Sequence, residues 1–242
     1  MNDYNRTFNY STSPEYFDMT TAFPKLMRSV YGWMCAGLAI TALAALTVAK
    51  TPELILAIMQ NSILIWGLLL GEIGLVIFLS ARIHKMSFAT ASFCYAAYAL
   101  LNGVTMSFLF FAYTMESIAS TFAITAGTFG AMSLVGFFIK KDLSAFGRIF
   151  LMLLIGIIIA TIVNIFVGST GIAMLLNYAG VVIFVGLTAY DTQKIKVMLQ
   201  QAADAGVSDQ TQKIALMGSL TLYLDFINLF LYLLRFFGNS RD

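Results

Sequence analysis

Charged residues are scarce in this chain. Asp, Glu, Lys and Arg together make up 11% of its 242 residues, whereas hydrophobic residues make up 60%. A soluble globular domain carries about 25% charged residues, so this composition excludes a protein that faces water on all sides. The chain contains instead a series of apolar runs, each close to the roughly 20 residues that a helix needs to cross a bilayer. There are seven such runs, at 30–49, 63–81, 88–112, 117–139, 149–167, 172–190 and 214–237.

Cysteine, histidine and phosphate-binding glycine loops are also rare or absent. Cys35 and Cys94 both fall inside apolar runs, which indicates packing residues, and no disulfide framework is expected. His84 is the only histidine, and the sequence supplies no partners nearby with which it could hold a metal. The absence of a phosphate-cradling glycine loop excludes an ATP-driven pump. We therefore expect no cofactor and no nucleic-acid partner.

The domain organisation follows from the apolar runs. Residues 1–29 form a polar lead of mixed charge, without the apolar core or the small-residue cleavage site of a secretory signal. The loops between the runs are too short to hold a separate soluble domain. We expect residues 30–238 to form one all-α bundle of seven transmembrane helices, a multi-pass protein of a bacterial inner (plasma) membrane.

The basic residues of the loops are unevenly divided between the two sides of the membrane. Alternating the loops places eleven on one side and three, Lys50, Arg235 and Arg241, on the other. Basic residues concentrate in cytosolic loops, so we expect the N-terminus in the cytosol and the C-terminus outside. The eleven residues of the predicted cytosolic side are Arg6, Lys25, Arg28, Arg82, Lys85, Lys140, Lys141, Arg148, Lys194, Lys196 and Lys213.

Two aspartates, Asp191 and Asp225, lie in the last two apolar helices, where a carboxylate is costly and is rarely kept without a function. Counted from the connecting loop, Asp191 lies 14 residues before Ala205 and Asp225 lies 16 residues after Asp209, a difference in depth of about 3 Å. Counted from the outer helix ends, the difference is about 10 Å. We prefer the first count because it spans one short turn. Paired carboxylates would share protons, which predicts a gate and pH sensor and a weak, transient calcium site.

Other polar residues could join this pair. Thr221, Asp225, Asn228 and Tyr232 follow the spacing of one helical face in a segment that is otherwise apolar all round, so this helix is expected inside the bundle. The segment that begins at Asp209 carries a D-x-x-Q pattern typical of a helix start. Further candidates for a polar path, each within an apolar run, are Glu72, Asn102 and Asn164.

Arg82 allows two interpretations. Arg82, at the predicted cytosolic end of its helix, could clamp a carboxylate as a latch or could serve as an interfacial anchor. Gly67, Gly71 and Gly74, and the segment ITAGTFGAMSLVG, form small-residue stripes that we interpret as sites of close helix packing.

Three segments, NGVTMSFLFFAYTMESIASTFAITAGTFGAMSLVGFFIKKDLS, GLTAYDTQKI and LTLYLDFINLFLYLLRFFG, resemble the transmembrane Bax inhibitor motif (Bax inhibitor-1-like) family. The resemblance runs from about Tyr31 to Gly238. It implies a seven-helix bundle with the C-terminal helix at its centre, and a passive, pH-sensitive leak of calcium ions across the membrane. The paired aspartates of the family fall on Asp191 and Asp225, and its latching arginine would match Arg82.

Three functions remain open. The first is the passive calcium leak gated by the aspartate pair, with calcium ions, protons and membrane lipid as its partners. The second is an intramembrane aspartyl protease, which we disfavour because Asp225 stands in LYLDF and not in the glycine-framed GxGD of such enzymes. The third is a regulator of a membrane protease or of cell survival, bound to a membrane-protein partner and without transport of its own. We expect the protein not to be an enzyme.

Overall fold

A computed structural model describes residues 19–203 and 207–239, and this part of the chain contains helices and no strands. Seven of the helices are long and apolar enough to cross a membrane, as the sequence predicts. They are α1 (Met19–Ala49), α3 (Ser62–Arg82), α4 (Phe88–Met106), α6 (Met115–Phe138), α7 (Ser144–Val167), α8 (Thr170–Ala203) and α9 (Asp209–Phe237). Three short helices, α2 (Pro52–Gln60), η1 (Ile83–Lys85) and α5 (Leu109–Ala112), lie in the connections.

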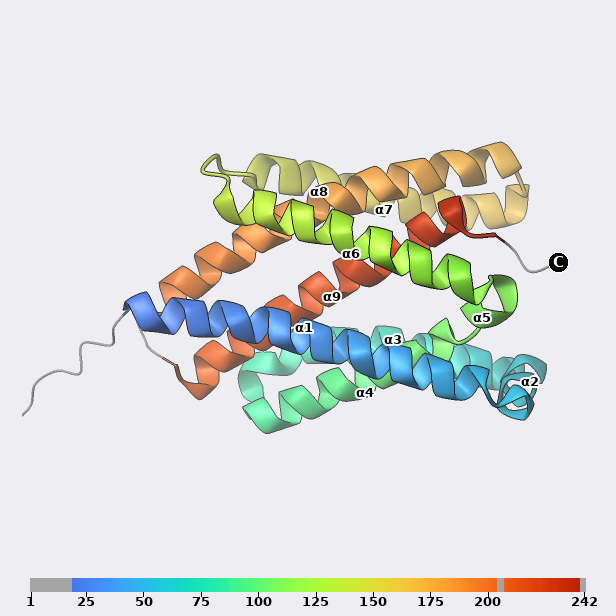
Figure 1. The fold of residues 1–242 in the computed structure, drawn as a ribbon, viewed down its shortest axis with the longest axis horizontal. Coiled ribbons are helices and arrows are strands. Elements are labelled where there is room, and N and C mark those ends of the chain that lie inside the picture. Colours follow the sequence, from blue (N-terminus) through green and yellow to red (C-terminus); the bar gives the residue numbers. More distant parts are fainter. Residues whose placement is uncertain (1–18, 204–206, 240–242) are drawn as a thin grey trace, which may run out of the picture.

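The helices form two groups of three that are joined by α9. In the first group α4 packs against both α1 and α3, and in the second α8 packs against both α6 and α7. Helix α9 runs obliquely between the groups and contacts α1, α4, α6 and α8 (Figure 1). Direct contact between the groups is mainly that of α1 with α8, so the bundle depends on its central helix.

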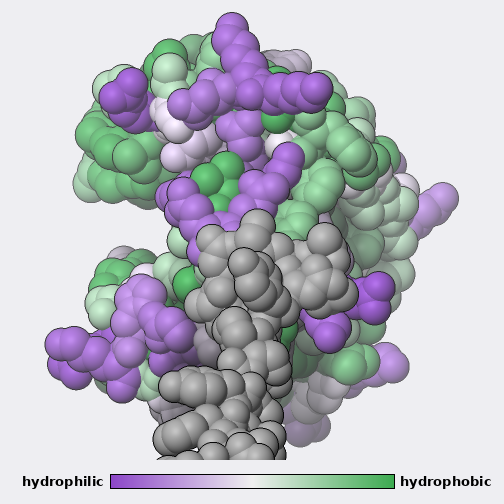
Figure 2. Space-filling view, turned by 90° about the vertical axis from the view of Figure 1, so that its left-hand side faces the viewer, coloured by the Kyte–Doolittle hydropathy of each residue, from purple (hydrophilic) through white to green (hydrophobic). Residues whose placement is uncertain are grey.

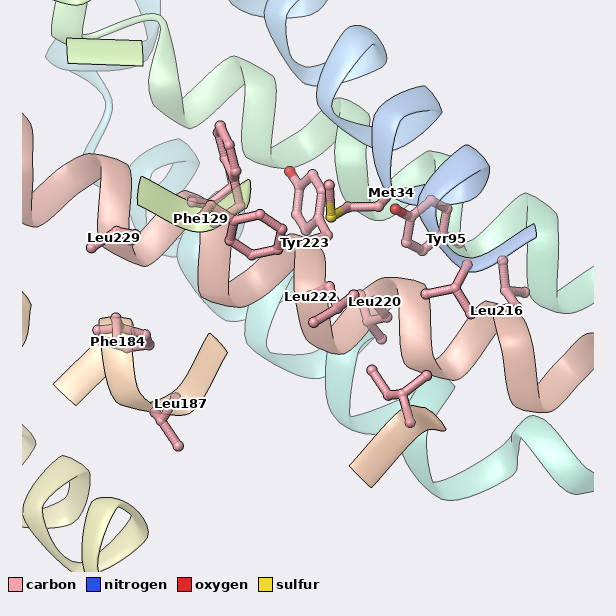
Figure 3. Close-up of a cluster of buried hydrophobic side chains, with 14 of the residues drawn as sticks. Met34, Tyr95, Phe129, Phe184, Leu187, Leu216, Leu220, Leu222, Tyr223 and Leu229 are labelled. Carbon is pink, nitrogen blue, oxygen red and sulfur yellow. The ribbon is translucent and has the colours of Figure 1, made fainter. Parts of the chain in front are cut away.

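The position of α9 follows from its sequence, and the prediction that it lies inside the bundle is confirmed. In its most apolar stretch 67% of the residues are buried, against 6% in α3 and in α7. Figure 3 shows side chains of α9, such as Leu216, Leu220 and Tyr223, surrounded by Tyr95 and Met34 and by residues of the other helices. A helix with apolar side chains all round buries most surface where helices surround it, whereas α3 and α7 expose theirs as lipid-facing helices would.

The basic residues gather at one end of the bundle, which we call the basic end. This end holds the start of α1, η1, the α6–α7 turn, the end of α8 and the start of α9 (Figure 1). Figure 2 shows hydrophilic side chains across it. It carries the described residues of the predicted cytosolic side, from Lys25 to Lys213. Since loops alternate between the two ends, the arrangement agrees with seven crossings.

Two helix starts differ from the prediction. Helix α1 begins at Met19 and not near residue 30, because Leu26 and Met27 are already packed in the core. Helix α9 is capped by Ser208, whose hydroxyl accepts the Thr211 N–H while the Thr211 hydroxyl accepts the Ser208 N–H at 2.8 Å. The predicted D-x-x-Q cap is therefore wrong by one residue. The predicted stop of the preceding helix at Gly206 lies outside the described residues.

Close helix packing occurs at glycines of only one of the two predicted stripes. Around an added Cβ at Gly67, Gly71 or Gly74 of α3, no atom of another described helix lies within 4 Å, so the predicted close packing is not found there. In the ITAGTFGAMSLVG segment of α6, by contrast, Gly136 lies directly against the backbone of Ala189 in α8. The two helices can approach this closely because glycine has no side chain.

Replacing Gly136 with alanine should therefore destabilise the protein. The added methyl group would collide with the carbonyl oxygen of Ala189, and overpacking of this kind costs about 1–3 kcal/mol. Gly127 of the same helix has open space around it and serves as the matched control. Thermal unfolding in detergent should show a lower melting temperature for Gly136→Ala than for Gly127→Ala, and equal melting temperatures would contradict the close contact.

Candidate functional site

The carboxyl groups of Asp191 in α8 and Asp225 in α9 meet inside the bundle. Their side chains are in hydrogen-bonding contact, and the two residues are 9% and 5% exposed. An ionised carboxylate can only accept hydrogen bonds, so a bond between two carboxyl groups requires a proton on one of them. Oδ2 of Asp225 is buried and has no hydrogen-bond donor in the described part of the chain. The structure thus places two carboxyl groups next to each other in a buried position.

The α8–α9 hairpin brings the two aspartates to the same depth. The helices pack against each other on either side of the short connection at the basic end, and Gly218 of α9 faces Ile195 of α8 closely. The count from the connecting loop therefore predicts the depth correctly. The count from the outer helix ends fails because, at the end remote from the basic end, α8 extends further beyond the pair than α9 does.

The YDTQ segment around Asp191 fixes this part of α8 on all sides. Tyr190 packs on Gly147 of α7, and the hydroxyl of Thr192, which is fully buried, donates to the Ser133 hydroxyl of α6 at 3.4 Å. Gln193 accepts the Leu143 N–H at 2.8 Å and donates to the carbonyl groups of residues 139 and 141 at 3.3 and 2.9 Å. The orientation of Asp191 is thus set by contacts with α6, α7 and the turn between them.

A cavity of about 540 Å³ opens beside the aspartate pair, between α3, α7, α8 and α9. The predicted polar face of α9 lines it in full, with Thr221, Asp225, Asn228 and Tyr232. The hydroxyl of Thr221 and the amide of Asn228 also donate to carbonyl groups of their own helix, at 3.2 and 2.8 Å. These bonds use the hydroxyl hydrogen of Thr221 and one N–H of Asn228. The side-chain oxygen atoms of both residues remain able to face a cation or water in the cavity.

Two further cavities lie between the pair and the basic end. One of about 170 Å³ shares Asp191, Lys194 and Thr221 with the first, and one of about 580 Å³ shares Tyr190 and Lys194. The larger one is bounded by the α6–α7 turn and by α8. Together they form an interrupted route from the surface of the basic end to the carboxyl groups. These cavities could not be predicted from the sequence, because they depend on how the helices splay.

The cations that line the aspartate cavity are Arg148 of α7 and Lys194 of α8. Arg82 is exposed at the end of α3, and no ion pair joins it to a carboxylate in the described part of the chain. Lys194 follows Asp191 by three residues and so shares its helix face, a spacing that is visible in the sequence. Its ammonium group lies 5.9 Å from the centre of the Tyr190 ring. The role of Arg82 as a latch stays a prediction.

Glu72 and Asn102 belong to a second polar cluster on the other side of α9. The Glu72 carboxyl accepts from the hydroxyl of Thr105 and from the amide of Asn102 at 3.5 Å. The hydroxyl of Tyr223, on α9, donates to Asn102 at 3.2 Å and lies 2.6 Å from the hydroxyl of Thr41 on α1. Residues two apart face opposite sides of a helix, so Tyr223 and Asp225 point away from each other. The structure therefore separates Glu72 and Asn102 from the aspartate pair.

Asn164 lies far from both clusters, near the end of α7 that is remote from the basic end. Its side-chain oxygen accepts the N–H of Ser169 at 3.2 Å, next to Gly168, which has a φ of 67°. The side chain thus stabilises the α7–α8 turn. No group of three or more His, Cys, Asp or Glu side chains that could hold a metal ion occurs among the described residues.

Comparison with known proteins agrees with this architecture. The family model "Inhibitor of apoptosis-promoting Bax1" matches residues 24–242. The inner membrane protein YbhL of Escherichia coli K12 is 47% identical over 215 residues, which cover 89% of this chain and 92% of the relative. The uncharacterized protein RP147 of Rickettsia prowazekii is 39% identical over the full length of both chains. The chain is an integral multi-pass membrane protein, and it belongs to the Bax inhibitor-1-like family.

The second cluster predicts the effect of a small change in α9. Tyr223→Phe removes the hydroxyl and leaves Asn102 and Thr41 without one buried partner, which costs about 1–3 kcal/mol. Tyr178→Phe is the matched control, because the ring of Tyr178 is exposed. We expect thermal unfolding in detergent to show a lower melting temperature for Tyr223→Phe alone. Equal melting temperatures would mean that the cluster does not hold α9 in place.

Proposed function

We propose that this protein is a passive, pH-sensitive leak for calcium or a similar cation, gated by Asp191 and Asp225. The observation that carries the proposal is the contact between two buried carboxyl groups beside a cavity of about 540 Å³. Calcium prefers oxygen ligands, and the pair offers four carboxyl oxygen atoms. Two carboxyl groups without a third acid form a weak site, which suits slow passage and not storage.

The proton acts as the competitor of the cation in this proposal. When the pair holds its proton, the two carboxyl groups bind each other and present at most one negative charge. When the proton leaves, two adjacent buried charges repel, and a cation between them relieves the repulsion. The charged and titratable groups that line the same cavity are Arg148 from α7, Lys194 and Tyr190 from α8, and Tyr232 from α9.

The closed end of the proposed route lies beyond the pair, away from the basic end. Tyr232 is seven residues further along α9 than Asp225, a rise of about 10 Å. Its ring stacks on Phe184 with centroids 5.7 Å apart and packs against Gly180. This aromatic contact between α8 and α9 would have to separate before a hydrated cation could pass.

The direct test measures calcium entry into dye-loaded liposomes that contain the purified protein, over a range of pH. Because the proposed sensor is one proton shared by two groups, Asp191→Asn or Asp225→Asn alone should flatten the pH dependence or move its midpoint, whatever happens to the absolute rate. A single variant that keeps the pH midpoint of the wild type would contradict the shared-proton gate. Flux no greater than in protein-free liposomes would contradict the leak itself.

Asp142 provides a control carboxylate outside the spans. Hydrogen bonds from the hydroxyl and the N–H of Ser144, at 2.7 and 2.9 Å, hold the pKa of Asp142 below its usual range. Asp142 therefore stays ionised at pH values down to the usual pKa range of aspartate, and it loses its charge only at lower pH. Because Asp142 lines the outer cavity of about 580 Å³, Asp142→Asn can change the absolute flux, but it should leave the pH midpoint unchanged. An altered midpoint would show that the assay responds to surface charge.

The cations that line the cavity should matter more than Arg82. Arg148→Gln or Lys194→Gln removes a positive charge that lines the cavity beside the pair, which should change the resting calcium flux severalfold and shift its pH midpoint. Arg82→Gln removes an exposed charge and should leave both nearly unchanged. The liposome assay distinguishes the alternatives: a change in Arg82→Gln alone would support the latch that the resemblance implies and contradict the role of the lining cations.

A further inference from the structure

An apolar groove of about 750 Å³ lies between α1 and α6, in the gap left by the two helix groups. Its floor contains Phe129 of α6 and Phe226 of α9, both buried. Small residues on the α6 side leave space in the groove, and an added Cβ at Gly130 would meet nothing within 4 Å. The groove holds almost no polar surface, so at membrane depth it would be filled by hydrocarbon and not by water.

The length of the groove fits an acyl chain. On α6 the lining residues run from Phe122 to Phe138, a rise of about 24 Å. The hydrocarbon core of a bilayer is about 30 Å thick, so one leaflet contributes about 15 Å. The groove runs along α6 from Phe138, at the basic end, and is longer than one leaflet is deep, so it can accommodate an acyl chain of the leaflet at that end.

The charges at the basic end of the groove fit an anionic headgroup. The ammonium group of Lys196 donates to the Phe137 carbonyl at 2.8 Å and lies 5.0 Å from the Phe137 ring, which lines the groove. Exposed Arg28 stands one helical turn before Tyr31, on the face of α1 that lines the groove, and exposed Lys140 follows the end of α6. Basic pockets between helices on the cytosolic side of a membrane bind the phosphate groups of lipids.

We propose that this groove is a binding site for an anionic phospholipid of the leaflet at the basic end. One acyl chain lies on Phe129 and Phe226, and the phosphate lies near Arg28 and Lys140. The site does not depend on the proposed leak. The lipid site nevertheless adjoins the leak route, because Phe226, in the floor of the groove, directly follows Asp225, and because Lys140 also lines the cavity of about 580 Å³.

Native mass spectrometry of the purified protein tests the proposal with two lipids of equal chain length, palmitoyl-oleoyl phosphatidylglycerol and palmitoyl-oleoyl phosphatidylcholine. The wild type should retain phosphatidylglycerol severalfold better than phosphatidylcholine. Gly130→Leu fills the groove and should lose most retained lipid of both kinds, whereas Arg28→Gln with Lys140→Gln should lose only the preference for phosphatidylglycerol.

Gly127→Leu is the matched control, because Gly127 also has open space around it but does not line the groove. It should retain lipid like the wild type, and equal melting temperatures of the two leucine variants would show that both are folded. Unchanged lipid retention in Gly130→Leu would overturn the proposal. So would a change in oligomeric state in Gly130→Leu without any change in lipid retention, because the groove would then be an interface between copies of the chain.

Discussion

The structure depends on the burial of two carboxyl groups in the middle of a membrane protein. Asp191 and Asp225 can remain there because each provides the partner of the other and because α8 and α9 pack closely on both sides of the contact. An unpaired carboxylate at that depth would cost several kcal/mol or more, which is a large part of the stability of a typical domain. The central position of α9 satisfies this constraint, since a lipid-facing helix could not cover Asp225.

The central helix also connects two polar clusters of different character. On one side Asp225 meets a single carboxyl group next to a cavity. On the other side Tyr223 joins a continuous set of hydrogen bonds that reaches Thr41, Asn102 and Glu72. The second cluster is more fully bonded and suits a fixed anchor to α1, α3 and α4. The aspartate pair, by contrast, has a carboxyl oxygen without a hydrogen-bond donor and lies beside a cavity that is lined by cations. This environment suits a group that changes its protonation.

Much of this architecture could be predicted because the membrane imposes simple rules. The seven spans follow from apolar length, and the central position of α9 follows from its apolar circumference. The meeting of Asp191 and Asp225 follows from residue counts on either side of one short loop. The cavities, Tyr223 and Arg148 could not be predicted in this way, because they depend on helix splay and side-chain direction, whereas the spacing of Lys194 three residues after Asp191 is visible in the sequence. Gly67, Gly71 and Gly74 show the limit of motif reasoning, since a small-residue stripe does not say which helix, if any, packs on it.

The central claim is that Asp191 and Asp225 titrate as one unit. Infrared spectroscopy of the carboxyl bands, recorded as a function of pH, measures this directly in the wild type and in the two single asparagine variants. The account predicts that replacing either aspartate changes the titration midpoint of the one that remains, because each loses the partner that shares its proton. If the remaining aspartate kept the midpoint it has in the wild type, the two groups would titrate independently, and the shared-proton account would be wrong.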